Sequence, residues 1–148
     1  MREQAGIMAD EWKPDRYFAL AGRPVMRVRN AEGAMGVREM HPVTGAFIPT
    51  HALYSRLNEG SIDLDELDRE AFLDLVVAWR AKLALQRRAE PIHWSPTGDE
   101  EYPWRAEQAG QPLLLRVNHY LPDPLYSVMI AGQAVEDLED WPQAWIRA

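Results

Sequence analysis

Residues 68–88 carry the most regular pattern in the chain, and this pattern limits the folds available to it. Apolar side chains recur there every three or four positions, which is the spacing of one face of an α-helix. They are Phe72, Leu75, Val76, Trp79 and Leu83. Acidic residues crowd the start of the segment and basic residues its end, as the helix dipole favours. We predict a helix that is capped by Asp65 or Asp68 and packs across a sheet. Leu73, Val77 and Ala84 are predicted to widen its apolar face.

Strand-like segments lie on both sides of this predicted helix. Residues 25–29 alternate apolar and charged side chains, and residues 35–40 follow after a turn-like sequence. Residues 113–118 alternate in the same way, and residues 125–130 follow after a second turn. This order of segments is typical of an α+β fold. We predict one antiparallel sheet, built from N- and C-terminal meanders and packed against one long central helix.

The length and the amino-acid composition restrict the class of protein. The chain has 148 residues, which predicts a single α+β domain over residues 1–148, with residues 1–15 interpreted as a flexible leader. It has no cysteine, which excludes disulfides, thiolate zinc sites and thiol nucleophiles. The N-terminus lacks the apolar run of a secretory signal, and no apolar stretch is long enough to span a bilayer. These features predict a cytoplasmic protein that does not bind membranes.

Residues 89–111 are predicted to form a long irregular connection, because three prolines and two glycines interrupt any regular pattern. Trp94 and Trp104 lie in this segment. One interpretation is that burial of their rings pins the connection to the domain. The alternative is that they stay partly exposed as anchors for a partner, since tryptophan is enriched at interface hot spots.

The negative charge is concentrated in the last third of the chain. Residues 91–148 hold 9 acidic and 3 basic side chains, and so supply −6 of the formal net charge of −7. An acidic protein of this kind is a poor nucleic-acid binder, because phosphates need cationic partners. Acidic side chains can instead steer a basic protein partner. The residues predicted to contact such a partner are Trp94, Trp104, Glu136, Asp137, Glu139, Asp140 and Trp141.

A search for catalytic and metal-binding motifs gives mostly negative results. The sequence contains no phosphate-binding loop, dinucleotide fingerprint, zinc-binding histidine pair or nucleophile elbow. Its four histidines are far apart in sequence, so we expect no metal and no cofactor. Arg116 and His119, near the end of a predicted strand, are the best candidates for acid–base chemistry. The simpler interpretation is that both lie on the solvent face.

Three hypotheses about function remain open from the sequence. The first is a small binding protein without catalysis, of the physical type of immunity proteins that neutralise basic bacterial toxins. The second is an assembly subunit, of phage-derived type, that forms homo-oligomers through exposed strand edges. The third is a small enzyme that uses Arg116 and His119 in a pocket between sheet and helix. We favour them in this order.

Overall fold

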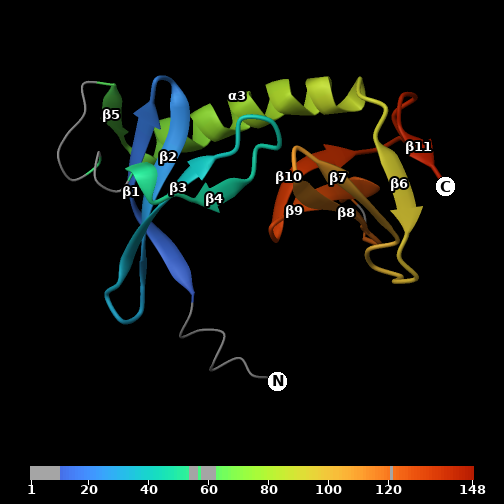
Figure 1. Ribbon diagram of the computed structural model, residues 1–148, viewed down its shortest axis with the longest axis horizontal. Helices are drawn as coiled ribbons and strands as arrows, with labels where there is room; N and C mark the ends of the chain where they lie inside the picture. Colours follow the sequence, from blue (N-terminus) through green and yellow to red (C-terminus); the bar gives the residue numbers. More distant parts are fainter. Residues whose placement is uncertain (1–10, 54–56, 58–62, 121) are drawn as a thin grey trace. The chain divides into compact units, whose positions relative to one another are not determined.

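The computed structural model describes most of the chain. The described residues are 11–53, 57, 63–120 and 122–148. They form an α+β structure whose strands pair antiparallel except at one short strand (Figure 1). The prediction of one sheet is wrong, because the strands belong to two separate sheets. No helix among the described residues is long and apolar enough to cross a membrane.

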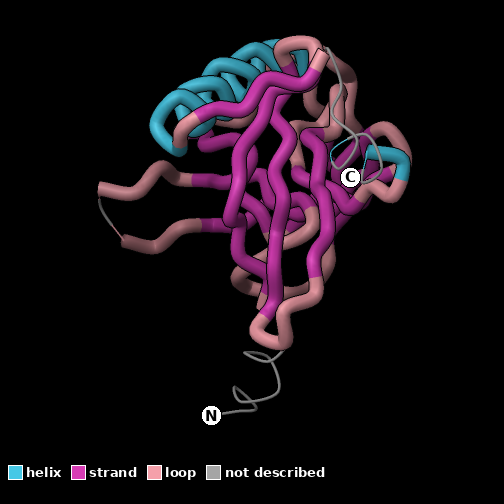
Figure 2. Tube along the Cα trace, turned by 90° about the vertical axis from the view of Figure 1, so that its left-hand side faces the viewer, coloured by secondary structure: helices cyan, strands magenta, loops and turns pink. Residues whose placement is uncertain are grey.

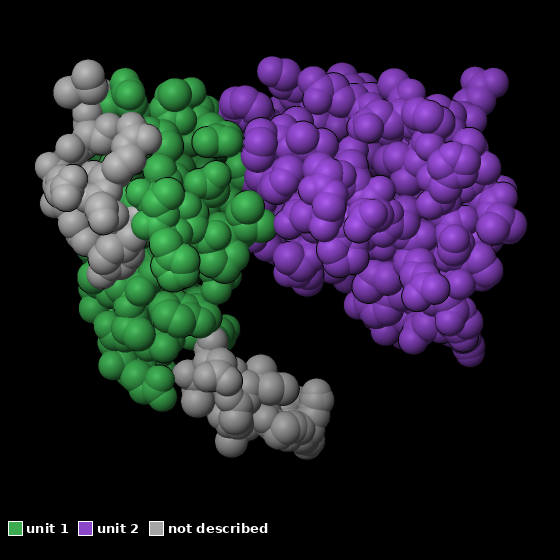
Figure 3. Space-filling view, in the orientation of Figure 1, with its two compact units in different colours: residues 1–40, 48–77 green, residues 41–47, 78–148 purple. Residues whose placement is uncertain are grey.

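The chain divides into two compact units (Figure 3). The first comprises residues 1–40 and 48–77, and the second comprises residues 41–47 and 78–148. The single domain expected over residues 1–148 stays a prediction.

The first unit contains a five-stranded sheet with the strand order β4-β3-β2-β1-β5 (Figure 2). Its strands are β1 (Trp12–Leu20), β2 (Arg23–Asn30), β3 (Met35–Met40), β4 (Phe47–Pro49) and β5 (Leu64–Leu67). The alternation of β1 and β2 buries one set of side chains in an apolar cluster, which contains Phe18, Leu20, Val25, Val37 and Leu53. Residues 12–15, predicted to be part of a leader, belong instead to β1. Residues 1–10 of that leader lie outside the described residues.

The second unit contains a six-stranded sheet with the strand order β10-β9-β8-β7-β6-β11. Its strands are β6 (His93–Pro96), β7 (Trp104–Gln108), β8 (Gln111–Val117), β9 (Tyr126–Ile130), β10 (Gln133–Leu138) and β11 (Ile146–Arg147). β11 pairs with β6 in parallel. The prediction of an irregular connection over residues 89–111 is wrong, because β6 and β7 both lie within it. Its prolines occur at or outside the strand ends, where a missing N–H does not interrupt the ladder.

Three of the hairpins share one turn sequence, alanine followed by glycine. The turns are Ala21-Gly22, Ala109-Gly110 and Ala131-Gly132, and all six residues have positive φ, between 50° and 82°. Positive φ at both positions is characteristic of the type I′ turn, whose twist matches that of paired strands. Alanine adopts this conformation at a steric cost. These turns fix the register of β1 with β2, of β7 with β8 and of β9 with β10.

Helix α3 (Arg69–Arg88) occupies the predicted position. Asp68 is its cap, because the Asp68 carboxylate accepts a hydrogen bond from the backbone N–H of Ala71 at 2.8 Å. Phe72, Val76 and Leu83 are buried as predicted, whereas Trp79 is only half-buried. The predicted widening of the apolar face is confirmed at Ala84, which is buried, and is wrong at Leu73 and Val77, which are 42% and 68% exposed.

Candidate functional site

An open pocket of about 780 Å³ lies beside the end of β10 in the second unit. The segment after β10 forms most of its wall and the last residue of α3 forms one side. The lining residues are Arg88, Asp137, Leu138, Glu139, Asp140, Trp141, Pro142, Gln143 and Ala144. Asp137, Glu139 and Asp140 are exposed, so three carboxylates border one concavity. We call these nine residues the acidic pocket.

An aromatic cluster holds Trp141 in place at this pocket. The Trp141 ring meets those of Trp94, Trp104 and Trp145 edge to face, with centroids 6.1, 5.9 and 5.8 Å away. Its indole N–H donates to the backbone carbonyl of Trp145 at 3.1 Å. The guanidinium of Arg147 on β11 lies 4.4 Å from the ring centroid of Trp141, a cation–π distance. Trp141 is therefore a rigid, half-exposed part of the pocket wall.

The segment that carries Trp141 turns back toward β6 through a single hydrogen-bonded turn. The N–H of Trp145 donates to the carbonyl of Pro142 at 3.1 Å, and β11 follows directly. β11 then adds to the sheet beside β6. Six of the pocket residues, from Glu139 to Ala144, therefore lie outside any helix or strand, in the segment that joins β10 to β11.

Two of the seven residues predicted to contact a partner are buried. Trp94 is 1% exposed and lies within the core of the second unit. Glu136 is 6% exposed because its carboxylate pairs inside the protein. Neither side chain is available to a partner in this structure. Trp94 and Glu136 are therefore removed from the set of residues predicted to contact a partner. Trp104 is half-buried, and its ring packs against that of Trp141.

The carboxylate of Glu136 joins a buried polar network at the C-terminal end of α3. Arg87, 1% exposed, donates to Glu136 at 2.7 Å, to the Gln108 side chain at 3.0 Å and to the carbonyl of Thr44 at 2.6 Å. Arg88 donates to the other Glu136 oxygen. The helix dipole, which favours basic side chains at the end of a helix, accounts for these two arginines in the sequence but does not predict this network. Val135 and Glu136 are neighbours in β10 and both are buried. A β-bulge between Ala134 and Glu136 interrupts the alternation of this strand, so the alternation of apolar and polar residues could not have shown that Glu136 is buried.

The charges that remain on the acidic pocket are not balanced. Its lining holds three carboxylates and one guanidinium, and that guanidinium, of Arg88, is already paired with Glu136. Ser127 donates to the Asp137 carboxylate at 2.8 Å. The side chains of Glu139 and Asp140 have no hydrogen bond or ion pair with any described residue. The site therefore presents acceptors and negative charge, which suits a cationic group.

No family model, curated protein or solved structure shows significant similarity to the chain. Any functional conclusion must therefore come from the chemistry of the site.

The candidates for acid–base chemistry lie at a separate hollow of about 390 Å³ after β8. There the side chain of Arg116 donates to Asn118 at 2.9 Å. Asn118 in turn donates to the carbonyl of Pro124 and to the hydroxyl of Ser127. His119 is exposed. The hydrogen bonds of Asn118 close the β8–β9 loop. The arrangement of Arg116 and Asn118 is therefore explained by the structure of this loop, without a catalytic role.

Metal ligands do not gather anywhere in the part of the chain that the structure describes. Within those residues, no three histidine or carboxylate side chains lie close enough together to hold an ion. His41 has a local role instead, because its ring nitrogen accepts hydrogen bonds from the N–H groups of Val43 and Thr44 at 3.1 and 3.3 Å. These bonds brace the turn that ends at Gly45.

Proposed function

We propose that the chain is a small, acidic, cytoplasmic binding protein without catalysis, and that its acidic pocket takes a cationic group of a basic protein partner. The supporting observation is the pairing of a rigid aromatic wall, Trp141, with the unpaired carboxylates of Glu139 and Asp140. An arginine or lysine side chain fits such a site, because it combines charge with an apolar stem. The most specific form of this proposal is an immunity-type protein that neutralises a basic toxin.

The direct test uses a defined cationic probe, a tetra-arginine peptide, with the full chain. The double variant Glu139→Lys/Asp140→Lys changes the charge of the pocket by four units. We expect it to abolish peptide binding, because attraction becomes repulsion at the same place. The buried Glu136 stays unchanged, since reversing it would break the network with Arg87.

The matched control is Glu100→Lys/Glu101→Lys, which makes the same change of net charge away from the acidic pocket. Both side chains are exposed. If this control weakens tetra-arginine binding as much as the pocket variant does, the attraction belongs to the whole acidic surface, and the proposed pocket is wrong. Affinity capture from the native host, with the pocket variant as the negative control, then identifies the physiological partner.

The assembly hypothesis makes a different forecast. A homo-oligomer would show a solution mass that rises with protein concentration, and the pocket variant would leave that mass unchanged. The enzyme hypothesis has less support, because Arg116 is hydrogen-bonded to the structural residue Asn118.

A further inference from the structure

Another hollow, of about 410 Å³, lies in the first unit over β3 and the end of β4. Pockets for small molecules typically measure about 300–1,000 Å³. Most of the lining is apolar and comes from Trp12, Val28, Met35, Val37 and Pro49. We call it the apolar hollow. It shares no residue with the acidic pocket, so a ligand in the hollow is independent of the function proposed for that pocket.

The floor of the apolar hollow is kept open by a glycine in the middle of a strand. Gly36 on β3 pairs with Val28 on β2, and it does not have the positive φ that favours glycine. A Cβ at this position would lie 3.6 Å from the Val28 side chain and 3.8 Å from that of Trp12, which are ordinary contacts. Backbone strain and steric conflict therefore do not explain the glycine. A glycine inside a strand often marks a bulge, a tight bend, or close approach of a ligand or of another backbone. The register of β2 with β3 is regular at Gly36, which excludes a bulge between these two strands.

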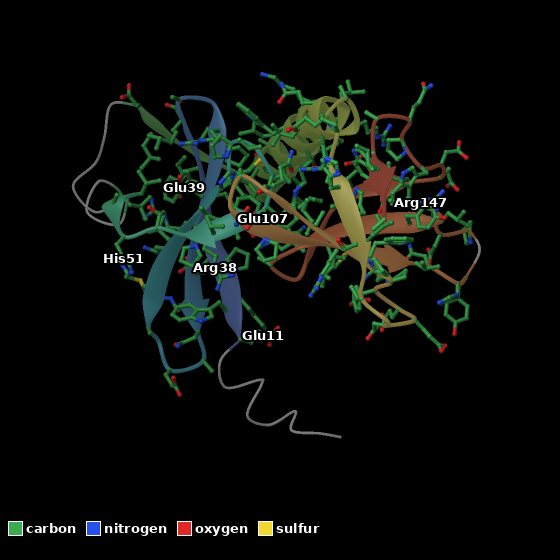
Figure 4. All side chains as sticks on the ribbon, turned by 45° about the vertical axis from the view of Figure 1, so that its right-hand side comes forward. Glu11, Arg38, Glu39, His51, Glu107 and Arg147 are labelled. Atoms are coloured by element: carbon green, nitrogen blue, oxygen red, sulfur yellow. The ribbon has the colours of Figure 1, made fainter. Side chains whose placement is uncertain are left out.

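The ionisable side chains of the lining are those of Arg38 and His51, and the lining contains no carboxylate. Figure 4 shows Arg38 on β3 and His51 just beyond the end of β4. Arg38 as a whole residue is half-buried, and its guanidinium forms no hydrogen bond or ion pair with any residue that the structure describes. An anion in the hollow would therefore meet a cation that has no other partner among these residues.

Arg38 differs in this respect from the other arginines on the strands of its sheet. Those arginines each have a carboxylate within 4.0 Å: Arg16 has Glu66, Arg23 has Glu39, and Arg27 and Arg29 share Asp15. The sheet thus neutralises its arginines systematically, in a chain with a net charge of −7. The exception is the one that borders the hollow.

We propose that the apolar hollow binds a small monocarboxylate with an aliphatic or aromatic body. The carboxylate pairs with the guanidinium fork of Arg38, whose geometry matches two carboxylate oxygens. The apolar body lies over Gly36 against Trp12 and Met35. A single arginine balances one negative charge, which favours a monoanion over a phosphate dianion.

The probe for this proposal is octanoate, titrated into the full chain by calorimetry and by NMR. We expect octanoate to bind, and octanol and octylamine to bind at least about tenfold more weakly, because neither carries an anionic head group. Arg38→Gln should weaken octanoate binding by about tenfold or more, and Gly36→Val should abolish it by filling the floor. Absence of octanoate binding, or equal binding of octanol, overturns the proposal.

The matched control is Arg69→Gln, which removes the same charge from an exposed position at the start of α3. Arg69→Gln should bind octanoate as tightly as the wild type does. If Arg38→Gln and Arg69→Gln lose the same amount of octanoate affinity, the attraction is non-specific and the proposal is overturned. If Gly36→Val folds poorly, Gly36→Ala replaces it, since its methyl group makes only ordinary contacts. Octanoate affinity unchanged in a folded Gly36 variant also overturns it. Tetra-arginine binding at the acidic pocket should persist in all these variants.

Discussion

Replacing Arg87 by methionine tests whether the end of α3 is held by a buried charge network. Methionine keeps much of the apolar stem of arginine and removes the guanidinium. Arg87 is 1% exposed and donates to Gln108, Glu136 and the carbonyl of Thr44 at 3.0, 2.7 and 2.6 Å. The substitution therefore leaves three buried acceptors without this donor. Burying an unpaired acceptor costs free energy even when the lost hydrogen bond itself contributes little.

The size of the expected loss in stability depends on which partners Glu136 keeps in the Arg87→Met variant. Removing one partner of a buried ion pair typically costs about 3–5 kcal/mol. Arg88 still pairs with Glu136 in the variant, so we expect the lower end, a loss of about 3 kcal/mol in the free energy of unfolding. Arg88→Met is the control. Its side chain is 42% exposed, whereas that of Glu136 is 1% exposed. Arg87 still pairs with Glu136 in this variant, so we expect a smaller loss in the free energy of unfolding than for Arg87→Met.

Urea unfolding followed by tryptophan fluorescence measures these losses, because Trp79, Trp94, Trp104, Trp141 and Trp145 all belong to the second unit. The double variant Arg87→Met/Glu136→Met completes a mutant cycle. It should be more stable than Arg87→Met alone, since it no longer buries an under-compensated carboxylate. A loss below about 1 kcal/mol in Arg87→Met, or strictly additive losses in the double variant, would refute the reasoning.

Two further predictions concern the sheets. Arg27 and Arg29 hold the pKa of the Asp15 carboxyl below its usual value of 3.8, mainly through the hydrogen bond from Arg27. A lowered pKa in the folded state stabilises the protein above the unfolded-state pKa, and this contribution disappears as the pH falls through the folded-state pKa. Asp15→Asn should therefore be less stable than the wild type above about pH 5, and urea titrations should show the difference narrowing below about pH 4; a pH-independent difference would contradict this account. Ala109→Asn should raise the free energy of unfolding by about 0.5–1 kcal/mol, because asparagine tolerates the positive φ of this turn better than alanine. Lower stability of this variant in the same assay would exclude a left-handed turn residue at position 109.

Local patterns in the sequence were enough to locate several elements. The apolar spacing and the Asp68 cap predicted α3, because helical hydrogen bonds and caps join residues close together in the chain. Residues 35–40 were predicted as the strand that became β3 (Met35–Met40). The sequence also placed the excess negative charge in the last third, since charge is a property of composition alone.

Long-range packing decided the rest. Trp94 and Glu136 both lie in strands with alternating faces, and which face is buried depends on partners far along the chain. For Glu136 that partner is Arg87, which is 49 residues away. The sequence did not predict β6 and β7, because their short segments show no clear alternation. They become strands by pairing with each other and, for β7, with β8. The acidic pocket and the apolar hollow likewise exist only in three dimensions. Trp12 borders the same hollow as Gly36 and Arg38, and Arg88 borders the same pocket as Glu139, only after the strands and the helix have packed.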